Sequence, residues 1–157
     1  MVVLTTALLM LMFRIINNLD FNTPPIVGDR VALQIAELLN KYNNLSLIHS
    51  SFSIKNDKGY YLVYMDGGRV IGCTAVRKEE PMLTRNYHTS VMDSYRGKGI
   101  GSLLIEEALK IVKTQFLFCT VRKDNHQSIA LYNKYKFVYV RDENKNLILM
   151  GRRNWTT

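Results

Sequence analysis

Cysteine is scarce in this chain of 157 residues, which contains only two. Cys73 and Cys119 lie far apart in apolar runs, with no CxxC pair and no histidine at the spacing of a zinc site. We therefore expect two reduced thiols in the core of a cytosolic protein, with neither a disulfide framework nor a metal centre. This excludes disulfide-stabilised secreted domains and zinc-binding modules.

The sequence also lacks an apolar run long enough to span a bilayer. Its first residues, MVVLTTALLMLMFRII, are apolar, but no Lys or Arg precedes them and Arg14 interrupts them. A signal peptide would need a positively charged start and a small-residue cleavage site, and neither is convincing here. We interpret residues 1–12 as an apolar N-terminal extension, with Met12 as an alternative start of translation, and expect a cytoplasmic protein without a membrane partner.

Repeats, linkers and low-complexity tracts are absent, which predicts a single domain over residues 1–157. The net charge of +8 is uneven, because residues 61–157 carry sixteen Lys and Arg against nine Asp and Glu, whereas residues 1–60 carry five against four. A basic field attracts phosphate groups of a cofactor or of a nucleic acid, although it can also serve solubility alone.

Apolar periodicity predicts an α/β fold with a mixed, mostly antiparallel central sheet and flanking helices, in the order β-α-α-β-β-β-α-β-α-β-β. We expect strands at residues 13–16, 60–65, 69–76, 82–92, 116–121, 137–140 and 147–150, and helices at 30–42, 45–52, 100–113 and 127–135. Asp29 is expected to cap the first helix, and Asp66-Gly67-Gly68 to form a hairpin turn. The strand at 116–121 is expected to be buried on both faces.

A glycine-rich turn, RGKGIGS at residues 96–102, stands directly before the third expected helix. Main-chain N–H groups at a helix start bind anions together with the helix dipole, and glycine lets phosphate oxygens approach closely. Two common phosphate-binding motifs do not fit. The Walker loop would need Ser or Thr after Lys98, and the dinucleotide fingerprint would need glycine at Ser102.

The pattern R-G-x-G-x-G after a strand ending at Val91 resembles the pyrophosphate-binding turn of the GNAT superfamily of N-acetyltransferases, which use acetyl-CoA. A second run, V-R-x-x-N-x-x-S-x-x-L-Y from Val121 to Tyr132 followed by Phe137, is similar to the family's other motif. Lys136 departs from the family, which usually has a glycine that ends the helix in a left-handed conformation. Lysine there costs about 1 kcal/mol, or the helix ends differently. The resemblance covers residues 60–150 well, and before them only the element order.

This resemblance implies that acetyl-CoA lies between two splayed strands, those expected at 82–92 and 116–121. The N–H of Val91 would stabilise the oxyanion, and Asn125 would help hold the pantetheine arm. Tyr132 would be the general acid for the departing thiolate, and its register in the motif favours this role over the alternative of packing in the core. The cofactor-binding residues expected on this basis are Val91, Arg96, Gly97, Lys98, Gly99, Ile100, Gly101, Ser102 and Asn125, with no metal.

A general base is harder to find, because no carboxylate stands on the strand before the glycine turn, where many relatives carry a glutamate. His88 is the only group there with a suitable pKa, about 6.5 when unperturbed, so it is the candidate base or else a hydrogen-bonded surface residue. Glu79, Glu80 and His126 are expected in solvent. Deprotonating a lysine amine at pH 7 requires about 4–5 kcal/mol, and an α-amine about 1. A missing base therefore favours α-amine acceptors.

The resulting hypothesis is an enzyme that moves an acetyl group from acetyl-CoA directly to a primary amine, with an α-amine of a protein or peptide preferred. Three alternatives stay open: a toxin-type acetyltransferase of aminoacyl-tRNA, suggested by the basic bias and the tail GRRNW; a small-amine acetyltransferase; and a non-catalytic acyl-CoA- or nucleic-acid-binding module. Because relatives often dimerise through their last strands, residues 147–150 are a candidate edge for a homodimer.

Overall fold

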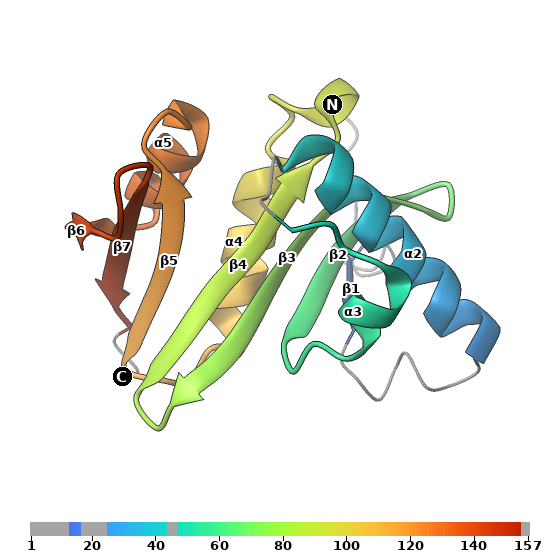
Figure 1. Cartoon of the computed structure of the whole chain (residues 1–157), viewed down its shortest axis with the longest axis horizontal. Helices are drawn as coiled ribbons and strands as arrows, with labels where there is room; N and C mark the ends of the chain where they lie inside the picture. Colours follow the sequence, from blue (N-terminus) through green and yellow to red (C-terminus); the bar gives the residue numbers. More distant parts are fainter. Residues whose placement is uncertain (1–12, 17–24, 44–46, 155–157) are drawn as a thin grey trace, which may run out of the picture.

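The computed structural model describes residues 13–16, 25–43 and 47–154 (Figure 1). Its elements follow the expected order, with one additional 3-10 turn: β1 (Phe13–Ile16), α2 (Pro25–Tyr42), α3 (Ser51–Lys55), β2 (Tyr60–Asp66), β3 (Arg69–Glu80), β4 (Leu83–Val91), η2 (Asp93–Tyr95), α4 (Ile100–Ile111), β5 (Phe116–Arg122), α5 (His126–Lys134), β6 (Val138–Asp142) and β7 (Leu147–Arg153). The expected apolar extension at 1–12 and Trp155 lie outside the described residues.

Seven strands form one sheet in the order β1-β2-β3-β4-β5-β7-β6. Neighbouring strands are antiparallel except β4 and β5, which run parallel. Helices α2 and α3 cover one face of the sheet and α4 covers the other (Figure 1). The mixed α/β fold predicted from the sequence is therefore confirmed.

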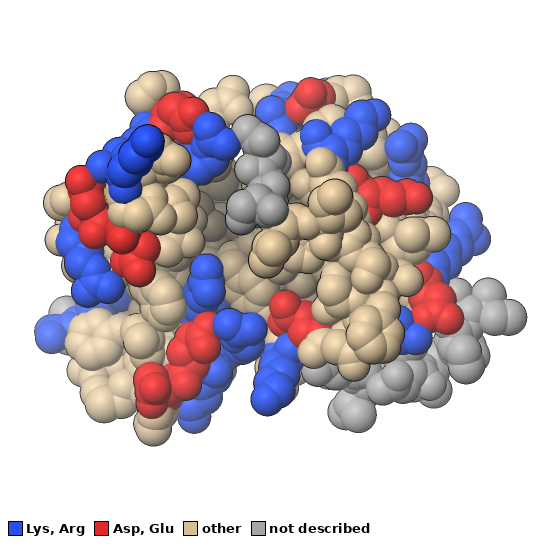
Figure 2. All heavy atoms as spheres, viewed as in Figure 1, with Lys and Arg blue, Asp and Glu red and all other residues tan. Residues whose placement is uncertain are grey.

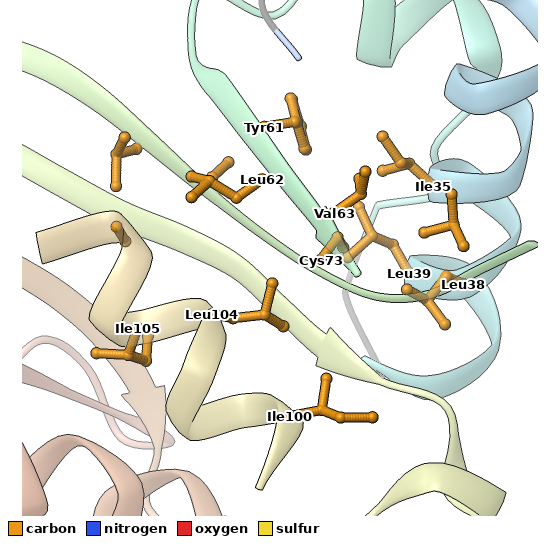
Figure 3. Packing of buried hydrophobic residues seen from close by; sticks show 14 of the residues in the cluster. Ile35, Leu38, Leu39, Tyr61, Leu62, Val63, Cys73, Ile100, Leu104 and Ile105 are labelled. Atoms are coloured by element: carbon orange, nitrogen blue, oxygen red, sulfur yellow. The ribbon is translucent and has the colours of Figure 1, made fainter. Parts of the chain in front are cut away.

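The core lies on both sides of the sheet, because strand side chains alternate between its faces (Figure 3). Buried residues of α2 and α4 pack against buried residues of β2 and β3, among them Ile35, Leu39, Tyr61, Leu62, Val63, Cys73, Leu104 and Ile105. Cys73 and Cys119 are both free and buried, as expected. No helix in the described part of the chain is long and apolar enough to cross a membrane.

Two helix boundaries differ from the prediction. Helix α2 begins at Pro25, because proline is favoured at the first helical position, where its missing N–H has no intrahelical partner to lose. Asp29 therefore lies inside α2, where it pairs with Lys55, and does not cap it. The second helix is Ser51–Lys55, and residues 47–50 of the expected range 45–52 are not helical, because Ser50 and Ser53 form a reciprocal capping box at the start of α3. Residues 45 and 46 lie outside the described residues.

The strands differ in three respects. Strand β3 continues to Glu80, so Glu79 and Glu80 lie at a strand end and not in the turn. Strand β5 buries only alternate residues, since its other face lines a cavity described below. Residues 147–150 are not an edge, because β7 lies between β5 and β6; β6 is the edge strand and exposes Val138, Tyr139 and Val140.

The parallel pairing of β4 with β5 is short, and this creates the site. It joins only residues 83–85 of β4 to 116–118 of β5, after which the strands diverge (Figure 1). Each strand keeps its other neighbour, β3 for β4 and β7 for β5. The inner edges of β4 and β5 therefore lie open beyond Arg85, as the resemblance implied.

Candidate active site

Two cavities meet at the opening between β4 and β5. One has a volume of about 660 Å³ and is lined by the glycine turn, the end of β4 and α5. The other has a volume of about 850 Å³ and is lined by residues of β3, β4, β5 and the loop between β6 and β7. Both cavities include Asn43, Thr89, Arg122, Asp124, Asn125 and Ser128 in their walls. A molecule bound in the smaller cavity can therefore present its end to the larger one.

The glycine turn has the geometry of an anion site. Gly97 and Gly99 adopt positive φ angles of 74° and 82°, which glycine reaches without strain. Gly99 is the N-cap of α4 and supplies no side-chain cap, so the first N–H groups of the helix face the smaller cavity without an intrahelical partner. Gly101 packs closely on α5, since an added Cβ would lie 3.3 Å from Leu131. A diphosphate fits these free amides and the helix dipole.

Of the two basic side chains of the turn, Arg96 lines the smaller cavity and Lys98 does not. Arg96 holds the turn in place: its Nε donates to Val91 O at 3.1 Å, and its Nη1 pairs with Asp93 at 3.0 Å. Lys98 does not line the cavity and lies over the Tyr95 ring at 5.2 Å. The ammonium that the structure brings to the start of α4 belongs to Lys134 of α5, whose Nζ donates to Ser102 Oγ at 3.1 Å.

Substituting Gly99 by valine is expected to raise the KM for acetyl-CoA by at least about tenfold. A β-branched residue is strained at φ +82°, and the turn would have to move its amides to relieve that strain. Gly68→Val is the matched control, since Gly68 has a φ of +77° in open space at the β2–β3 hairpin. Steady-state kinetics of both variants measure the effect, and an equal rise of KM in the two would contradict it.

A bulge in β4 turns its main chain towards the opening. Ser90 pairs with Cys73 and Tyr87 with Ala75, so His88 and Thr89 together face a single residue of β3. His88 has a φ of +54°, which is uncommon for a residue with a side chain and recurs beside active sites.

The N–H of Val91 points into the opening. Met92 donates its N–H to Ile71 O at 2.8 Å, and successive N–H groups of a strand point to opposite edges. Val91 therefore directs its N–H away from β3, towards the space between β4 and β5. This is the orientation that an oxyanion donor requires.

Tyr132 of α5 is buried and belongs to a closed ring of hydrogen bonds. Its hydroxyl donates to Asn86 Oδ1 at 2.6 Å, and Asn86 Nδ2 donates to Thr74 Oγ1 at 2.8 Å. Thr74 and Thr89 hydroxyls are 2.7 Å apart, and Thr89 Oγ1 lies 3.0 Å from the Tyr132 hydroxyl. Four side chains from two strands and a helix thus fix the phenol at the wall of the larger cavity.

The direction of every hydrogen bond in this ring follows from one contact. Asn86 Nδ2 also donates to Ala75 O at 2.9 Å, and a carbonyl can only accept, so the amide orientation is determined. Tyr132 must then donate to Asn86 Oδ1, which leaves Thr89 to donate to Tyr132 and Thr74 to donate to Thr89. Burial raises the pKa of Tyr132 well above its usual range, so the phenol keeps its proton.

His88 lies in an aromatic cluster on the wall of the larger cavity. Its Nδ1 is 2.8 Å from the Tyr61 hydroxyl, and its ring is 4.6 Å from the rings of both His49 and Tyr87. Tyr87 in turn donates to Asp57. Burial, helped by the charge of His49, lowers the pKa of His88 to about 4. The imidazole is therefore neutral at pH 7, and accepting a proton from an ammonium of pKa about 8 would cost about 5 kcal/mol.

Four more residues that the sequence singled out are placed by the structure, and of these Asn125 lines the two cavities. Asn125 is the N-cap of α5, where its Oδ1 accepts from Ser128 N at 3.1 Å, and it lines both cavities. Lys136 does adopt a left-handed φ of +65°, so α5 ends as the family's glycine would end it. His126 is exposed at the start of α5. Arg152 of the basic tail lies in β7 and donates to Tyr135 O at 2.9 Å.

Sequence reasoning missed the residues that hold Tyr132, namely Asn86, Thr74 and Thr89, and it missed Lys134. The available signal was Asn86 itself, since asparagine is depleted in strands and its position in the alternation is a buried one. Within the described residues, no three His, Cys, Asp or Glu side chains are grouped to hold a metal ion.

Comparisons with known proteins agree with this geometry. A curated N-alpha-acetyltransferase of Saccharolobus solfataricus is 35% identical over 71 residues, which are 41% of this chain and 42% of that protein, so the match spans less than half of the relative. The crystal structure of Ard1 from Thermoplasma volcanium superimposes with a TM-score of 0.70 at 20% identity, over 92% of this chain and 97% of that one. The acetyltransferase yncA of Salmonella typhimurium, solved with acetyl-CoA, superimposes with a TM-score of 0.67 at 12% identity, over 92% and 94%.

The family comparison covers most of the site. The acetyltransferase (GNAT) family matches residues 31–137, more than half of the chain, from α2 through the glycine turn to the end of α5. With the splayed strands, the glycine turn and the shared fold, this match shows that the chain belongs to the GNAT acetyltransferase family.

Proposed function

We propose that this acetyltransferase moves an acetyl group from acetyl-CoA directly to the α-amine of a protein or peptide. The observation that supports this most is the pair of cavities meeting at Thr89 and Asn125, with free helix amides in one and Tyr132 in the wall of the other. The smaller cavity takes the diphosphate and the pantetheine arm. The larger cavity takes the acceptor amine, which then attacks the thioester carbonyl.

Three groups of the chain would act on the reacting atoms. The Val91 N–H donates to the oxygen that becomes negative, in an opening where β4 and β5 supply no competing hydrogen bond. The Tyr132 hydroxyl, which the ring aims at Asn86, can rotate about its C–O bond and donate its proton to the sulfur as the C–S bond breaks. The proton that the acceptor nitrogen loses passes to solvent, and the phenol is restored from solvent. His88, being neutral, acts as a hydrogen-bonding group for the acceptor and not as its proton acceptor.

A site without a strong base selects amines that are already neutral in part. The neutral fractions of an α-amine and a lysine amine at pH 7 differ about 300-fold. In the described part of the larger cavity wall, the two carboxylates are Asp57 and Asp124, and both have partners, in Tyr87 and Arg122. This arrangement supports the α-amine preference inferred from the sequence.

A pH–rate profile on peptides that offer one amine type each tests this function. With an α-amine peptide, we expect kcat/KM to fall below about pH 8 as the acceptor becomes protonated. With a lysine peptide the same fall should begin near pH 10, so that at pH 7 the α-amine reacts at least about tenfold faster. Titration of His88 should not appear in this profile, because its pKa of about 4 lies below the pH values at which the two amines titrate.

Equal rates for the two peptides at pH 7, or a limb near pH 6.5 with both, would overturn this assignment. Incubating labelled acetyl-CoA with protein, small-amine and tRNA pools, followed by mass spectrometry, distinguishes the alternatives. Label in peptide N-termini is the expected result. Label confined to aminoacyl-tRNA or to polyamines would replace the proposed acceptor class.

A further inference from the structure

Two arginines stand directly opposite each other on the wall of the larger cavity, which takes the acceptor in the proposed function. Arg77 of β3 pairs in register with Arg85 of β4, and both guanidinium groups lie beside the Tyr87 ring, at 5.3 and 5.8 Å from its centre. Like charges directly opposite in a sheet are destabilising. A destabilising pair that lines a functional cavity needs a reason other than the fold.

Of the two arginines, Arg85 has the fewer hydrogen-bond partners. Its Nε is buried and has no hydrogen-bond partner among the described residues, whereas Arg77 donates to Glu79 Oε1 through Nε at 3.1 Å and Nη2 at 2.7 Å. Asp57, the carboxylate on this side of the cavity, accepts from the Tyr87 hydroxyl and from Gly59 N through its Oδ1 and forms no ion pair with Arg85. A buried donor without an acceptor is costly. Because Arg85 also lines the larger cavity, a ligand there can supply an acceptor to the rest of its guanidinium group.

Two other cations of this cavity, Arg122 and Lys123, are paired with carboxylates, and Lys145 lies in the loop between β6 and β7. Arg122 forms a two-pronged contact with Asp124 at 2.9 and 2.7 Å, and Lys123 contacts Asp142 at 2.6 Å. Figure 2 shows this face of the molecule hollowed between the part formed by β5 and β7 and the part formed by α2 and α3, with Lys and Arg side chains around the hollow. Of the three arginines that line this cavity, Arg85 is therefore the one without a carboxylate partner among the described residues.

Arg85 lies close to the place where acetyl transfer is proposed. It is the last residue of β4 that pairs with β5, so it stands where the opening begins. Asn86, which holds the Tyr132 hydroxyl, is the next residue. Thr89, four residues after Arg85 and next to the bulge at His88, lines the same cavity. An anion bound by Arg85 would therefore lie in the cavity that takes the acceptor amine.

Taking the peptide acceptor proposed above as given, we propose that Arg85, with Arg77 beside it, is a binding subsite for a carboxylate of the acceptor. The enzyme then prefers α-amines of peptides whose first or second residue is Asp or Glu. A planar guanidinium with free N–H groups matches a carboxylate in two-pronged geometry.

Two peptide amides that begin Ser-Glu and Ser-Gln, otherwise identical and free of lysine, test the subsite. The readout is the ratio of their kcat/KM values at saturating acetyl-CoA, because the amount of folded enzyme cancels from a ratio. We expect the native enzyme to favour the Ser-Glu peptide about tenfold or more, and Arg85→Gln to bring the ratio close to one. Arg85→Glu should reverse the preference in favour of a Ser-Arg peptide.

Arg69→Gln is the matched control, since Arg69 is an exposed arginine at the other end of β3, and it should keep the native ratio. A ratio near one in the native enzyme, or an unchanged ratio in Arg85→Gln, overturns the subsite while leaving the proposed function intact. Transfer to no peptide at all overturns the proposed function and the subsite with it. Free glutamate reacting faster than the Ser-Glu peptide would also overturn the peptide subsite.

Discussion

Tyr132→Phe is expected to lower kcat for acetyl transfer by about 10²–10⁴-fold, the range over which a positioned acid contributes. Of the four hydrogen-bonded side chains, Tyr132 is the one that comes from α5. Phenylalanine keeps the shape of its side chain but removes the hydroxyl that donates the proton. Binding of CoA should persist, because the glycine turn and the start of α4 are unchanged. Thiol release and calorimetric titration with CoA measure the two effects separately.

Tyr135→Phe is the control for this substitution. Tyr135 follows directly after α5, and its hydroxyl donates to Glu106 Oε1 at 2.6 Å, away from the ring around Tyr132. That variant should retain nearly native kcat. If Tyr132→Phe also turned over within about twofold of the native enzyme, the phenol would be a packing residue, and the thiolate would take its proton from elsewhere.

Asn86→Leu is expected to lower the free energy of unfolding by about 3 kcal/mol and to abolish most activity. Leucine has a similar volume, but it leaves the Tyr132 hydroxyl, Thr74 Oγ1 and Ala75 O without their partner in a buried site. Each orphaned group costs about 1–3 kcal/mol, and partial rearrangement of the hydroxyls recovers some of this. Urea unfolding followed by circular dichroism gives the change in free energy.

An exposed asparagine supplies the comparison. Asn133→Leu on α5 removes the same side chain from the surface, where no ring depends on it, and should change stability by less than about 0.5 kcal/mol. A loss in Asn86→Leu no larger than this would mean that water or a shifted hydroxyl replaces the amide, and that the ring contributes little to holding Tyr132.

Much of the site was predictable, because the motifs that form it are local. The turn at residues 96–102 needs only glycines, a helix start and a preceding strand, and all three are visible in consecutive residues. Asn125 and Lys136 likewise act within one helix, the first as its cap and the second at its left-handed end. Short-range hydrogen bonding decides such features, and it depends on neighbours in the chain.

Helix boundaries were less predictable, because several residues compete for each end. Asp29 and Pro25 are both reasonable starts for α2, and the structure uses proline. The start of α3 depended on Ser50 and Ser53 bonding reciprocally, a pattern that the apolar periodicity of residues 45–52 concealed. A helix cap is worth only about 1 kcal/mol, so competing starts within a few residues of each other are hard to rank from the sequence.

The amino-acid sequence by itself determined the order of elements, the glycine turn and the helix that carries Tyr132, because each depends on contacts within a few residues. Only the tertiary structure decided what surrounds that phenol and the acceptor. Asn86 and Tyr132 are 46 positions apart, and Arg77 faces Arg85 only through the register of β3 and β4. The pKa of His88 also depends on burial by distant segments. Pairing, burial and charge are properties of the packed sheet, and no window of sequence contains them.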